Sequence, residues 1–172
     1  MNIILCGYHC SGKTTIAKAF AKKYQYQFID TDHLISEEMC VSESREAHSL
    51  LGEDDFRALE KNIVHSIKDI ENTIIATGGG VLVNSDSTKH LRTLGKIIYL
   101  YLDPQLMLAR IIAKKSFPNF IRESHIDEDF KRYIDSRKTL YALQADITFN
   151  TTGKTVDEIV LLINQYRSDY GI

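Results

Sequence analysis

The stretch that most constrains the fold of this chain lies within its first fourteen residues. A short apolar run, Ile3–Cys6, leads into Gly7–Thr14 (GYHCSGKT), and a segment of helical period follows. The eight residues match G-x-x-x-x-G-K-[ST] in full, between an expected strand and an expected helix, as a phosphate-binding loop requires. Glycines let backbone N–H groups point at a phosphate beside the positive end of the helix dipole. The alternative is a glycine-rich turn with a chance lysine, and the complete match argues against it.

The residue types in this loop suit ATP. Lys13 can place a positive charge between the β- and γ-phosphates, so we expect it to be catalytic, and the Thr14 hydroxyl can bind Mg²⁺. The loop residues expected to contact ATP are Gly7, Ser11, Gly12, Lys13 and Thr14. Cys10 is either a small filler residue or, once oxidised, a block to phosphate entry.

Short apolar runs alternate along the chain with longer segments of helical period. The strands that we expect are Ile3–Cys6, Gln27–Ile29, Thr73–Ala76, Ile97–Leu102 and Ile147–Phe149. Several are apolar without alternation, which is typical of a parallel sheet covered on both faces. Expected helices include Lys13–Tyr24, Asp127–Ala145, Val156–Tyr166 and one opened by Asp103-Pro104. This order predicts a three-layer α/β fold with a doubly wound, five-stranded parallel sheet and ligands at the carboxyl ends of the strands.

Length and charge exclude several classes of protein. A chain of 172 residues fits a single domain, 1–172. Its 21 basic and 23 acidic residues nearly cancel, which gives no reason to expect a nucleic-acid or membrane partner. Three cysteines lack metal-ligand spacing, and the N-terminal apolar run is too short for a signal peptide or a membrane span. We therefore expect a cytoplasmic, reduced, monomeric protein.

Two acids follow the second expected strand. Asp30 and Asp32 lie at the sheet edge that also carries the phosphate loop, so we expect them to face the γ-phosphate. Asp30 can hold Mg²⁺ through water, and Asp32 can orient an attacking hydroxyl or accept its proton as a catalytic group. Alternatively, Asp32 or Thr31 only caps a helix that starts near His33.

Two arginines and a glycine triplet each allow two interpretations. Arg57 and Glu60 lie three apart on an expected helix, where an exposed ion pair would contribute little. The triplet Gly78–Gly80 follows an apolar strand and indicates either a tight turn or close approach of a ligand. Arg137 in the long late helix is by default an exposed, solvated arginine.

Five segments in this order resemble the shikimate kinase family. They are Gly7–Thr14, Asp30-Thr31-Asp32, Gly52-Glu53-x-x-Phe56-Arg57-x-x-Glu60, Ala76–Gly80 and Arg137-x-x-x-Tyr141. The phosphate loop alone is shared by many families, whereas the ordered combination is far more specific. Order and spacing match from the first residue to about Asn150.

The resemblance implies transfer of the γ-phosphate of ATP to the 3-hydroxyl of shikimate, with Mg²⁺ as the metal. Arg57 and Arg137 would hold the shikimate carboxylate, because a planar guanidinium matches a carboxylate in bidentate fashion. Asp32 would contact the ring hydroxyls, and Asp30 would serve Mg²⁺. Backbone N–H groups near Gly79 and Gly80 would assist, and Gly78 would belong to the same substrate-binding turn.

The resemblance also implies a helical substrate-binding segment over residues 31–62 and a mobile lid over 111–125. Arg110 would stack on adenine, although a solvated cation at a helix end is the alternative. The family usually carries Arg-Pro-Leu-Leu in the lid, and this chain reads Phe117-Pro118-Asn119-Phe120 instead. Since the missing cation would stabilise the transferring phosphoryl group, we expect Arg122 or Lys115 to replace it. Otherwise the enzyme is slow or its substrate differs.

Two other functions compete with this interpretation. Another small-molecule kinase, acting on gluconate or a nucleoside monophosphate, would use the phosphate loop equally well but leaves Arg57, Arg137 and the glycine triplet without a joint purpose. A non-catalytic nucleotide switch would leave the acid pair unused, and the chain has no Asn-Lys-x-Asp segment for reading guanine.

Overall fold

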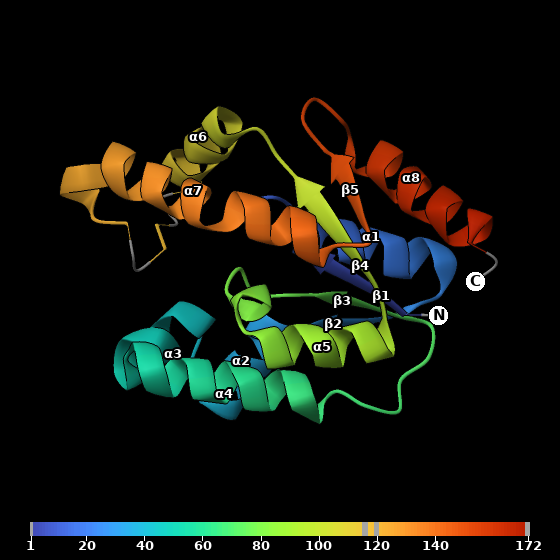
Figure 1. The fold of residues 1–172 in the computed structure, drawn as a ribbon, viewed down its shortest axis with the longest axis horizontal. Coiled ribbons are helices and arrows are strands. Elements are labelled where there is room, and N and C mark those ends of the chain that lie inside the picture. Colours follow the sequence, from blue (N-terminus) through green and yellow to red (C-terminus); the bar gives the residue numbers. More distant parts are fainter. Residues whose placement is uncertain (1, 115–116, 119–120, 171–172) are drawn as a thin grey trace.

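A computed structural model of the chain describes residues 2–114, 117–118 and 121–170, and five strands within these ranges form one parallel sheet. The strand order is β2-β3-β1-β4-β5 (Figure 1). The strands are β1 (Asn2–Cys6), β2 (Gln27–Asp30), β3 (Thr73–Ala76), β4 (Gly95–Tyr101) and β5 (Ile147–Asn150). The expected α/β fold with a five-stranded parallel sheet is therefore confirmed.

Helices connect the strands and cover the two faces of the sheet, so the chain forms three layers (Figure 1). The helices are α1 (Lys13–Tyr24), α2 (Thr31–Glu38), α3 (Ser44–Leu51), α4 (Glu53–Ser66), α5 (Ser85–Leu94), α6 (Pro104–Lys114), α7 (Ile126–Gln144) and α8 (Val156–Asp169). Two 3₁₀ turns, η1 (Val81–Val83) and η2 (Glu123–His125), complete the described elements.

Alternate residues of the central strand belong to two separate cores. Ile3 and Leu5 pack with the apolar faces of α1 and α8, whereas Ile4 and Cys6 pack on the other face with residues of α4 to α7. All four side chains are buried. A central strand buried on both faces must be apolar at every position, which explains the continuous run read from the sequence.

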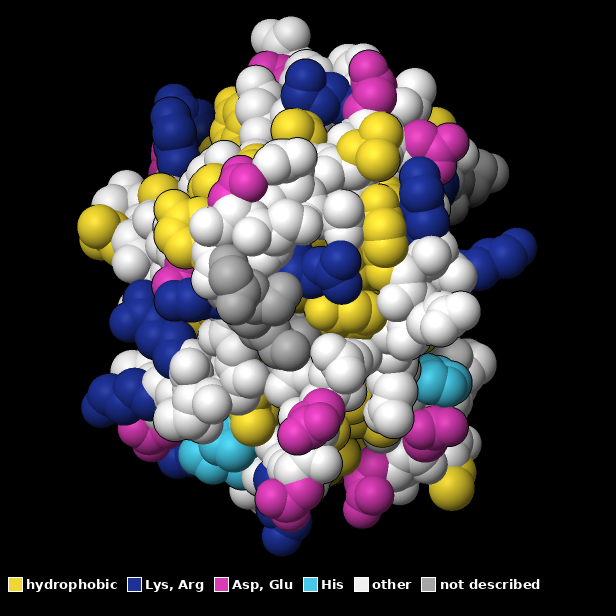
Figure 2. Space-filling view, turned by 90° about the vertical axis from the view of Figure 1, so that its right-hand side faces the viewer, with side chains coloured by type: hydrophobic (Ala, Val, Ile, Leu, Met, Phe, Trp, Pro, Cys, Tyr) yellow, Lys and Arg dark blue, Asp and Glu magenta, His cyan; other side chains and the backbone are white. Residues whose placement is uncertain are grey.

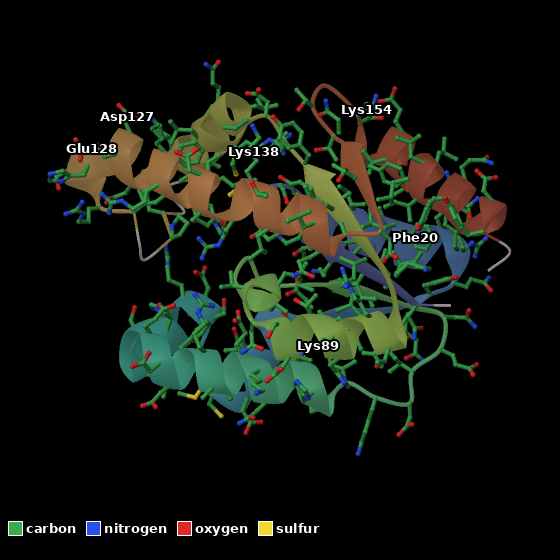
Figure 3. All side chains as sticks on the ribbon, in the orientation of Figure 1. Phe20, Lys89, Asp127, Glu128, Lys138 and Lys154 are labelled. Atoms are coloured by element: carbon green, nitrogen blue, oxygen red, sulfur yellow. The ribbon has the colours of Figure 1, made fainter. Side chains whose placement is uncertain are left out.

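The stick view shows how side chains divide between core and surface (Figure 3). Phe20 points from α1 toward the sheet, whereas Asp127 and Glu128 project outward from the start of α7 (Figure 3). On the face drawn in Figure 2, basic and acidic side chains lie next to one another. Among the described residues, no helix is long and apolar enough to span a membrane.

Several expected boundaries need correction. The strand expected at Ile97–Leu102 begins earlier, at Gly95, which pairs with Asn2 and leaves no room for a Cβ atom against the Asn2 carbonyl. The last helix runs on to Asp169, beyond the expected end at Tyr166, whose side chain still packs in the core. The helix expected near His33 begins at Thr31.

The segment 31–62 is helical, as expected, and consists of α2, α3 and most of α4. In the range expected to form a lid, α6 continues to Lys114 and η2 occupies Glu123–His125. Residues 115–116 and 119–120 of that range lie outside the described residues.

Candidate active site

The phosphate loop leaves β1 at the centre of the sheet and enters α1. Gly7 and Gly12 have φ angles of 146° and 93°, which side-chain-bearing residues rarely adopt. A Cβ atom on Gly7 would also stand 2.8 Å from the carbonyl oxygen of Leu100 in β4. Both glycines are therefore required by the backbone geometry of the loop.

Lys13 lies at the start of α1 and is buried beneath the loop. Its ammonium donates to the carbonyl oxygens of Gly7 at 2.9 Å and Tyr8 at 2.8 Å. Burial lowers the pKa of Lys13, and the nearby carboxylates of Asp32 and Asp30 oppose this effect. The positive charge is thus held at the loop by groups from β2 and α2.

Cys10 adopts a left-handed conformation with φ of 59°. Its thiol is half-buried, and burial raises its pKa, although the cations Lys114, Lys13 and Arg110 act in the opposite direction. A raised pKa keeps the thiol protonated near neutral pH and therefore slow to oxidise. This environment favours the interpretation of Cys10 as a filler residue.

A cavity of about 510 Å³ opens along the phosphate loop. Its lining includes the expected ATP contacts Ser11, Gly12, Lys13, Thr14 and Arg110, but not Gly7. Arg110 donates a hydrogen bond of 3.3 Å to the carbonyl oxygen of Cys10, so the guanidinium is fixed at the cavity wall. Arg110 is thus not simply a solvated helix-end cation.

Asp30 links the phosphate loop to the second strand. Its Oδ2 accepts a hydrogen bond of 2.7 Å from the Thr14 hydroxyl, and its Oδ1 accepts one of 3.0 Å from the Asp32 N–H. The residue that caps α2 is therefore Asp30, and the expected cap by Asp32 or Thr31 is wrong. Thr31 instead accepts a hydrogen bond of 2.8 Å from the Gly78 N–H.

Asp32 lies in the first turn of α2, beside both Lys13 and the glycine triplet. Burial raises the pKa of its carboxyl group, and the charge of Asp30 adds to the rise. Lys13 and Arg57 lower it and only partly offset these effects. A carboxylate with a raised pKa next to a reacting centre is a suitable proton acceptor.

A second cavity, of about 530 Å³, lies between the phosphate loop, the helical segment and α7. The expected site residues that line it are Thr14, Asp30, Asp32, Arg57, Gly79, Gly80 and Arg137. His9, Thr14 and Asp32 line both cavities. The two spaces therefore meet at the loop, where a phosphoryl group can pass from one to the other.

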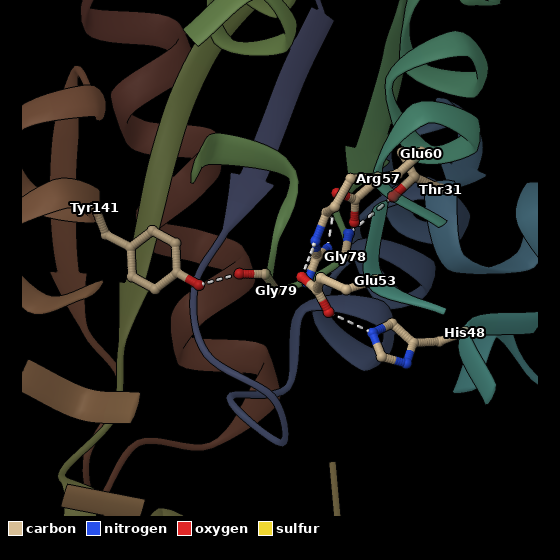
Figure 4. Close-up of polar contacts among 8 residues, drawn as sticks. All are labelled: Thr31, His48, Glu53, Arg57, Glu60, Gly78, Gly79 and Tyr141. Atoms are coloured by element: carbon tan, nitrogen blue, oxygen red, sulfur yellow. Dashed lines mark hydrogen bonds and ion pairs between the residues drawn. The ribbon is translucent and has the colours of Figure 1, made fainter. Parts of the chain in front are cut away.

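Arg57 is held on both sides by carboxylates of its own helix (Figure 4). Its Nε donates to Glu53 at 2.8 Å, and one Nη donates to Glu60 at 2.9 Å. The Glu60 side chain is only 4% exposed, and burial raises its pKa although Arg57 lowers it. Glu53 in turn contacts the His48 ring at 2.6 Å. The Arg57–Glu60 pair is therefore not the exposed pair that sequence spacing allowed.

The glycine triplet has no residue with a left-handed φ, so its composition has another cause. A Cβ atom on Gly80 would stand 2.1 Å from an Arg57 nitrogen, and one on Gly78 would stand 2.8 Å from an Asp32 oxygen. The segment also forms a turn, with the Val81 N–H donating to the Gly78 carbonyl. The triplet accordingly makes room for two site side chains, an alternative that the sequence did not suggest.

Arg137 points from α7 toward the second cavity and is half-buried, unlike the solvated residue of the default interpretation. Its guanidinium lies 4.6 Å from the centre of the Tyr133 ring, and one nitrogen donates to the Ser136 hydroxyl at 3.1 Å. Tyr133 was not expected in the site. Its position four residues before Arg137, on the same helix face, is the signal that could have found it.

Arg122, one of the two expected lid cations, is bound to Asp129. Its Nε, one Nη and its backbone N–H all donate to that carboxylate, which is buried. The other expected cation, Lys115, lies outside the described residues. Sequence analysis missed one cation in this region. Arg45 of α3 donates a hydrogen bond of 3.1 Å to the Phe117 carbonyl.

Comparison with known sequences gives one consistent result. A family model described as "Shikimate kinase" matches residues 9–166. The shikimate kinase of Caldanaerobacter subterraneus subsp. tengcongensis is 36% identical over 160 residues, which cover 92% of this chain and 91% of the relative. That of Bacillus mycoides is 33% identical over 164 residues, which cover 95% and 96%.

Solved structures give the same result. Shikimate kinase from Acinetobacter baumannii in complex with shikimate matches with a TM-score of 0.89 at 25% identity, over 98% of this chain and 93% of that one. Shikimate kinase from Bacteroides thetaiotaomicron matches with a TM-score of 0.85 at 29% identity, over 98% of both chains. The similarity therefore extends over sequence and fold together.

Proposed function

The chain belongs to the shikimate kinase family and is an ATP-dependent phosphotransferase. On that premise, we propose that ATP binds in one cavity and shikimate in the other, and that the γ-phosphate passes between them to the 3-hydroxyl of shikimate. The observation that carries the proposal is the shared wall of His9, Thr14 and Asp32. ATP bound along the loop and an acceptor bound in the second cavity would meet at this wall. In-line transfer needs the reacting atoms held in contact and aligned.

The donor side is the cavity along the phosphate loop. Backbone N–H groups between Gly7 and Thr14 would bind the phosphates, and the Lys13 ammonium would turn from the loop carbonyls to the β- and γ-phosphates. Ser11 and Gly12 line the same space. Arg110, fixed against the loop through the Cys10 carbonyl, would stack on the adenine ring.

The acceptor side is the second cavity, where Arg57 and Arg137 would bind the shikimate carboxylate. Glu53 and Glu60 bind two of the three nitrogens of the Arg57 guanidinium, so its remaining N–H donors are oriented by its own helix. Tyr133 lies beneath Arg137 and restricts its position. Two guanidinium groups with restricted freedom bind a carboxylate tightly and in one direction. Backbone N–H groups of Gly79 and Gly80, which line this cavity, would add to the acceptor contacts, whereas the Gly78 N–H is already bonded to Thr31.

Asp32 would orient the 3-hydroxyl and accept its proton as the bond to phosphorus forms. Its raised pKa, caused first by burial, improves it as a proton acceptor. Lys13 lies nearby and would stabilise the negative charge on the transferring group. Loose transition states of phosphoryl transfer need little covalent help, so position and charge account for most of the rate.

Thr14 and Asp30 fit a magnesium ion chemically. Both offer oxygen atoms, the ligands that Mg²⁺ prefers, and their contact at 2.7 Å places these oxygens together at the cavity wall. Among the described residues, no cluster of three His, Cys, Asp or Glu side chains forms a metal cage. When bound, Mg²⁺ neutralises charge on the β- and γ-phosphates.

We propose Lys115 as the cation of the lid. The Arg122 side chain donates two hydrogen bonds to Asp129, and their loss would leave that buried carboxylate with only the Arg122 backbone N–H and a longer contact of 3.7 Å to Arg132. We therefore favour Lys115 over Arg122 as the charge that replaces the family's lid arginine.

A coupled assay of ADP formation tests the proposed function. Purified protein with ATP, Mg²⁺ and shikimate should form ADP, and the product should carry phosphate on the 3-hydroxyl. Gluconate and a nucleoside monophosphate serve as competing acceptors in parallel assays. Equal or faster turnover with either of them would refute shikimate as the acceptor, and ADP release without any acceptor would refute the kinase mechanism.

A further inference from the structure

One tyrosine touches three parts of the site at once. The Tyr133 hydroxyl accepts a hydrogen bond of 3.2 Å from the His9 N–H of the phosphate loop. It also lies 3.1 Å from the place where a Cβ atom on Gly79 would stand. The face of its ring supports the Arg137 guanidinium at 4.6 Å. Tyr133 therefore contacts the phosphate loop, the Gly78–Gly80 turn, which we call the acceptor turn, and Arg137 of the proposed carboxylate clamp.

A second tyrosine of α7 extends this contact to the backbone of the acceptor turn. Tyr141 donates its hydroxyl proton to the Gly79 carbonyl. Burial raises the pKa of Tyr133, and a hydrogen bond with Tyr141 is among the interactions that oppose the rise. The two hydroxyls also converge on Gly79, because they lie 3.1 and 3.9 Å from the place where a Cβ atom on that residue would stand.

The His9 N–H, the Tyr133 and Tyr141 hydroxyls and the Gly79 carbonyl therefore lie next to one another, and we call this group the tyrosine relay. Each hydroxyl bonds the backbone of one segment: Tyr133 accepts from the phosphate loop, and Tyr141 donates to the Gly78–Gly80 turn. The relay crosses the wall where the two cavities meet, since His9 lines both of them.

Rigid packing holds the relay in place. Tyr8, the second residue of the phosphate loop, is fully buried, and its hydroxyl donates to the Ile134 carbonyl of α7 at 3.0 Å. Its ring packs edge-on against those of Tyr133 and Tyr141, with centroids 5.4 and 5.0 Å apart. Such contacts leave the aromatic rings little freedom to move.

We propose that Tyr133 is a positioning residue that holds the phosphate loop and the acceptor turn in register through the tyrosine relay. The inference rests on the proposed function and adds to it a residue that aligns the two substrates. Phosphoryl transfer depends on alignment more than on covalent chemistry, so loss of register lowers the rate without removing a reacting group.

The central variant is Tyr133→Phe, which removes the hydroxyl and keeps the ring beneath Arg137. We expect kcat to fall about tenfold while KM for shikimate stays within about twofold, because alignment is lost and the clamp is retained. Tyr133→Leu removes the ring as well, so KM for shikimate should also rise, by roughly threefold to tenfold. A merely structural role would not separate kcat from KM in this way.

Tyr99→Phe is the matched control. Tyr99 is buried in the same aromatic cluster, 5.2 Å from the Tyr141 ring, but its hydroxyl bonds neither the His9 N–H nor the Gly79 carbonyl. Its kcat should stay within about twofold of the wild type. If Tyr133→Phe and Tyr99→Phe lose the same activity, general damage to the cluster explains both and the proposal is overturned.

The double variant Tyr133→Phe/Tyr141→Phe tests whether the hydroxyls act as one chain. Either single substitution interrupts the relay, so the double variant should lose no more kcat than the worse single variant. Losses that multiply would show two independent contacts and overturn the relay.

Titration calorimetry with ADP and Mg²⁺ gives a measurement that needs no acceptor. Tyr133→Phe should bind ADP roughly threefold to tenfold more weakly, since the His9 N–H loses its partner and the loop its anchor. Tyr99→Phe should bind ADP like the wild type. If Tyr133→Phe binds ADP with unchanged affinity, the bond between Tyr133 and the His9 N–H does not position the loop, whether or not the wild type uses shikimate. Failure of the wild type to use shikimate would count only against the proposed acceptor.

Discussion

Thr14 and Asp30 meet at 2.7 Å, hydroxyl to carboxylate, although one belongs to the first helix and the other to the end of β2. The same carboxylate caps α2 through the Asp32 N–H. One side chain therefore fixes the position of the phosphate loop, of the helix that carries Asp32 and of two oxygen ligands suited to Mg²⁺. The predictions below test the groups that this arrangement brings together.

Lys13→Ala should reduce turnover by at least about a thousandfold, because the substituted loop lacks the cation closest to the transferring phosphate. The measurement is ADP formation at saturating ATP and shikimate, with circular dichroism to check folding. Lys22→Ala, at an exposed position of the same helix, is the control and should turn over normally. A folded Lys13→Ala protein with more than a tenth of wild-type activity would contradict this role.

Arg57→Ala should raise KM for shikimate by about a hundredfold and leave ADP affinity unchanged, since a buried charge-assisted contact to the acceptor is lost. Lys61→Ala removes a cation one turn further along α4, where it pairs with the exposed Asp86, and should leave KM unchanged. Steady-state kinetics with varied shikimate separate the two. A normal KM in Arg57→Ala would refute the clamp.

Gly80→Ala should raise KM for shikimate about tenfold, because its Cβ atom would stand 2.1 Å from an Arg57 nitrogen and displace the guanidinium. In an Arg57→Ala background the same substitution should change KM for shikimate little, since the clashing group is gone. The measurement is a double-mutant cycle on KM. Equal effects of Gly80→Ala in both backgrounds would show that the glycine acts independently of Arg57.

Cys10→Gly should stabilise the fold by about 0.5–1 kcal/mol, because φ of 59° is strained for cysteine and free of strain for glycine. The expected rise in Tm is roughly 1–4 °C for a chain of this length. Cys10→Ser keeps the strain and serves as the matched control. A lower Tm for Cys10→Gly than for Cys10→Ser would show that the thiol contributes packing that outweighs the strain.

The low-pH limb of kcat/KM for shikimate should reflect Asp32. Burial and the charge of Asp30 raise its pKa, so its carboxylate takes up a proton at a higher pH than an ordinary aspartate does. Because the base must be unprotonated, activity should fall as the pH drops through this raised pKa and recover above it. Asp32→Asn, which keeps the shape, should lose activity at every pH. A variant with the wild-type pH profile would exclude Asp32 as the base.

The local sequence pattern was sufficient to predict the strands and the phosphate loop. A strand that is buried on both faces must be an apolar run. The loop motif alone shows where glycines are needed, and these two glycines have φ angles of 93° and 146°. The cap on α6 by Asp103, whose carboxylate accepts from the Gln105 and Leu106 N–H groups, also follows from neighbouring residues. The helical segment over residues 31–62, in contrast, was implied by the resemblance to the family. The motifs that identified the family are runs of this kind.

Other features depended on residues far apart in the sequence. The partner that Gly80 makes room for is Arg57, and the partner of the His9 N–H is Tyr133, 124 residues away. The capping role moved from Asp32 to Asp30 because Thr14 holds the Asp30 carboxylate from another element.

The amino-acid sequence alone thus predicted the five strands, several of the helices and a loop suited to phosphate, because periodicity and glycine placement act over a few residues. Only the tertiary structure decided that Glu60 is buried against Arg57 and that two tyrosines of α7 join the loop to the acceptor turn. Burial and hydrogen-bond partners are set when distant segments pack, and no local pattern encodes the direction in which a side chain then points.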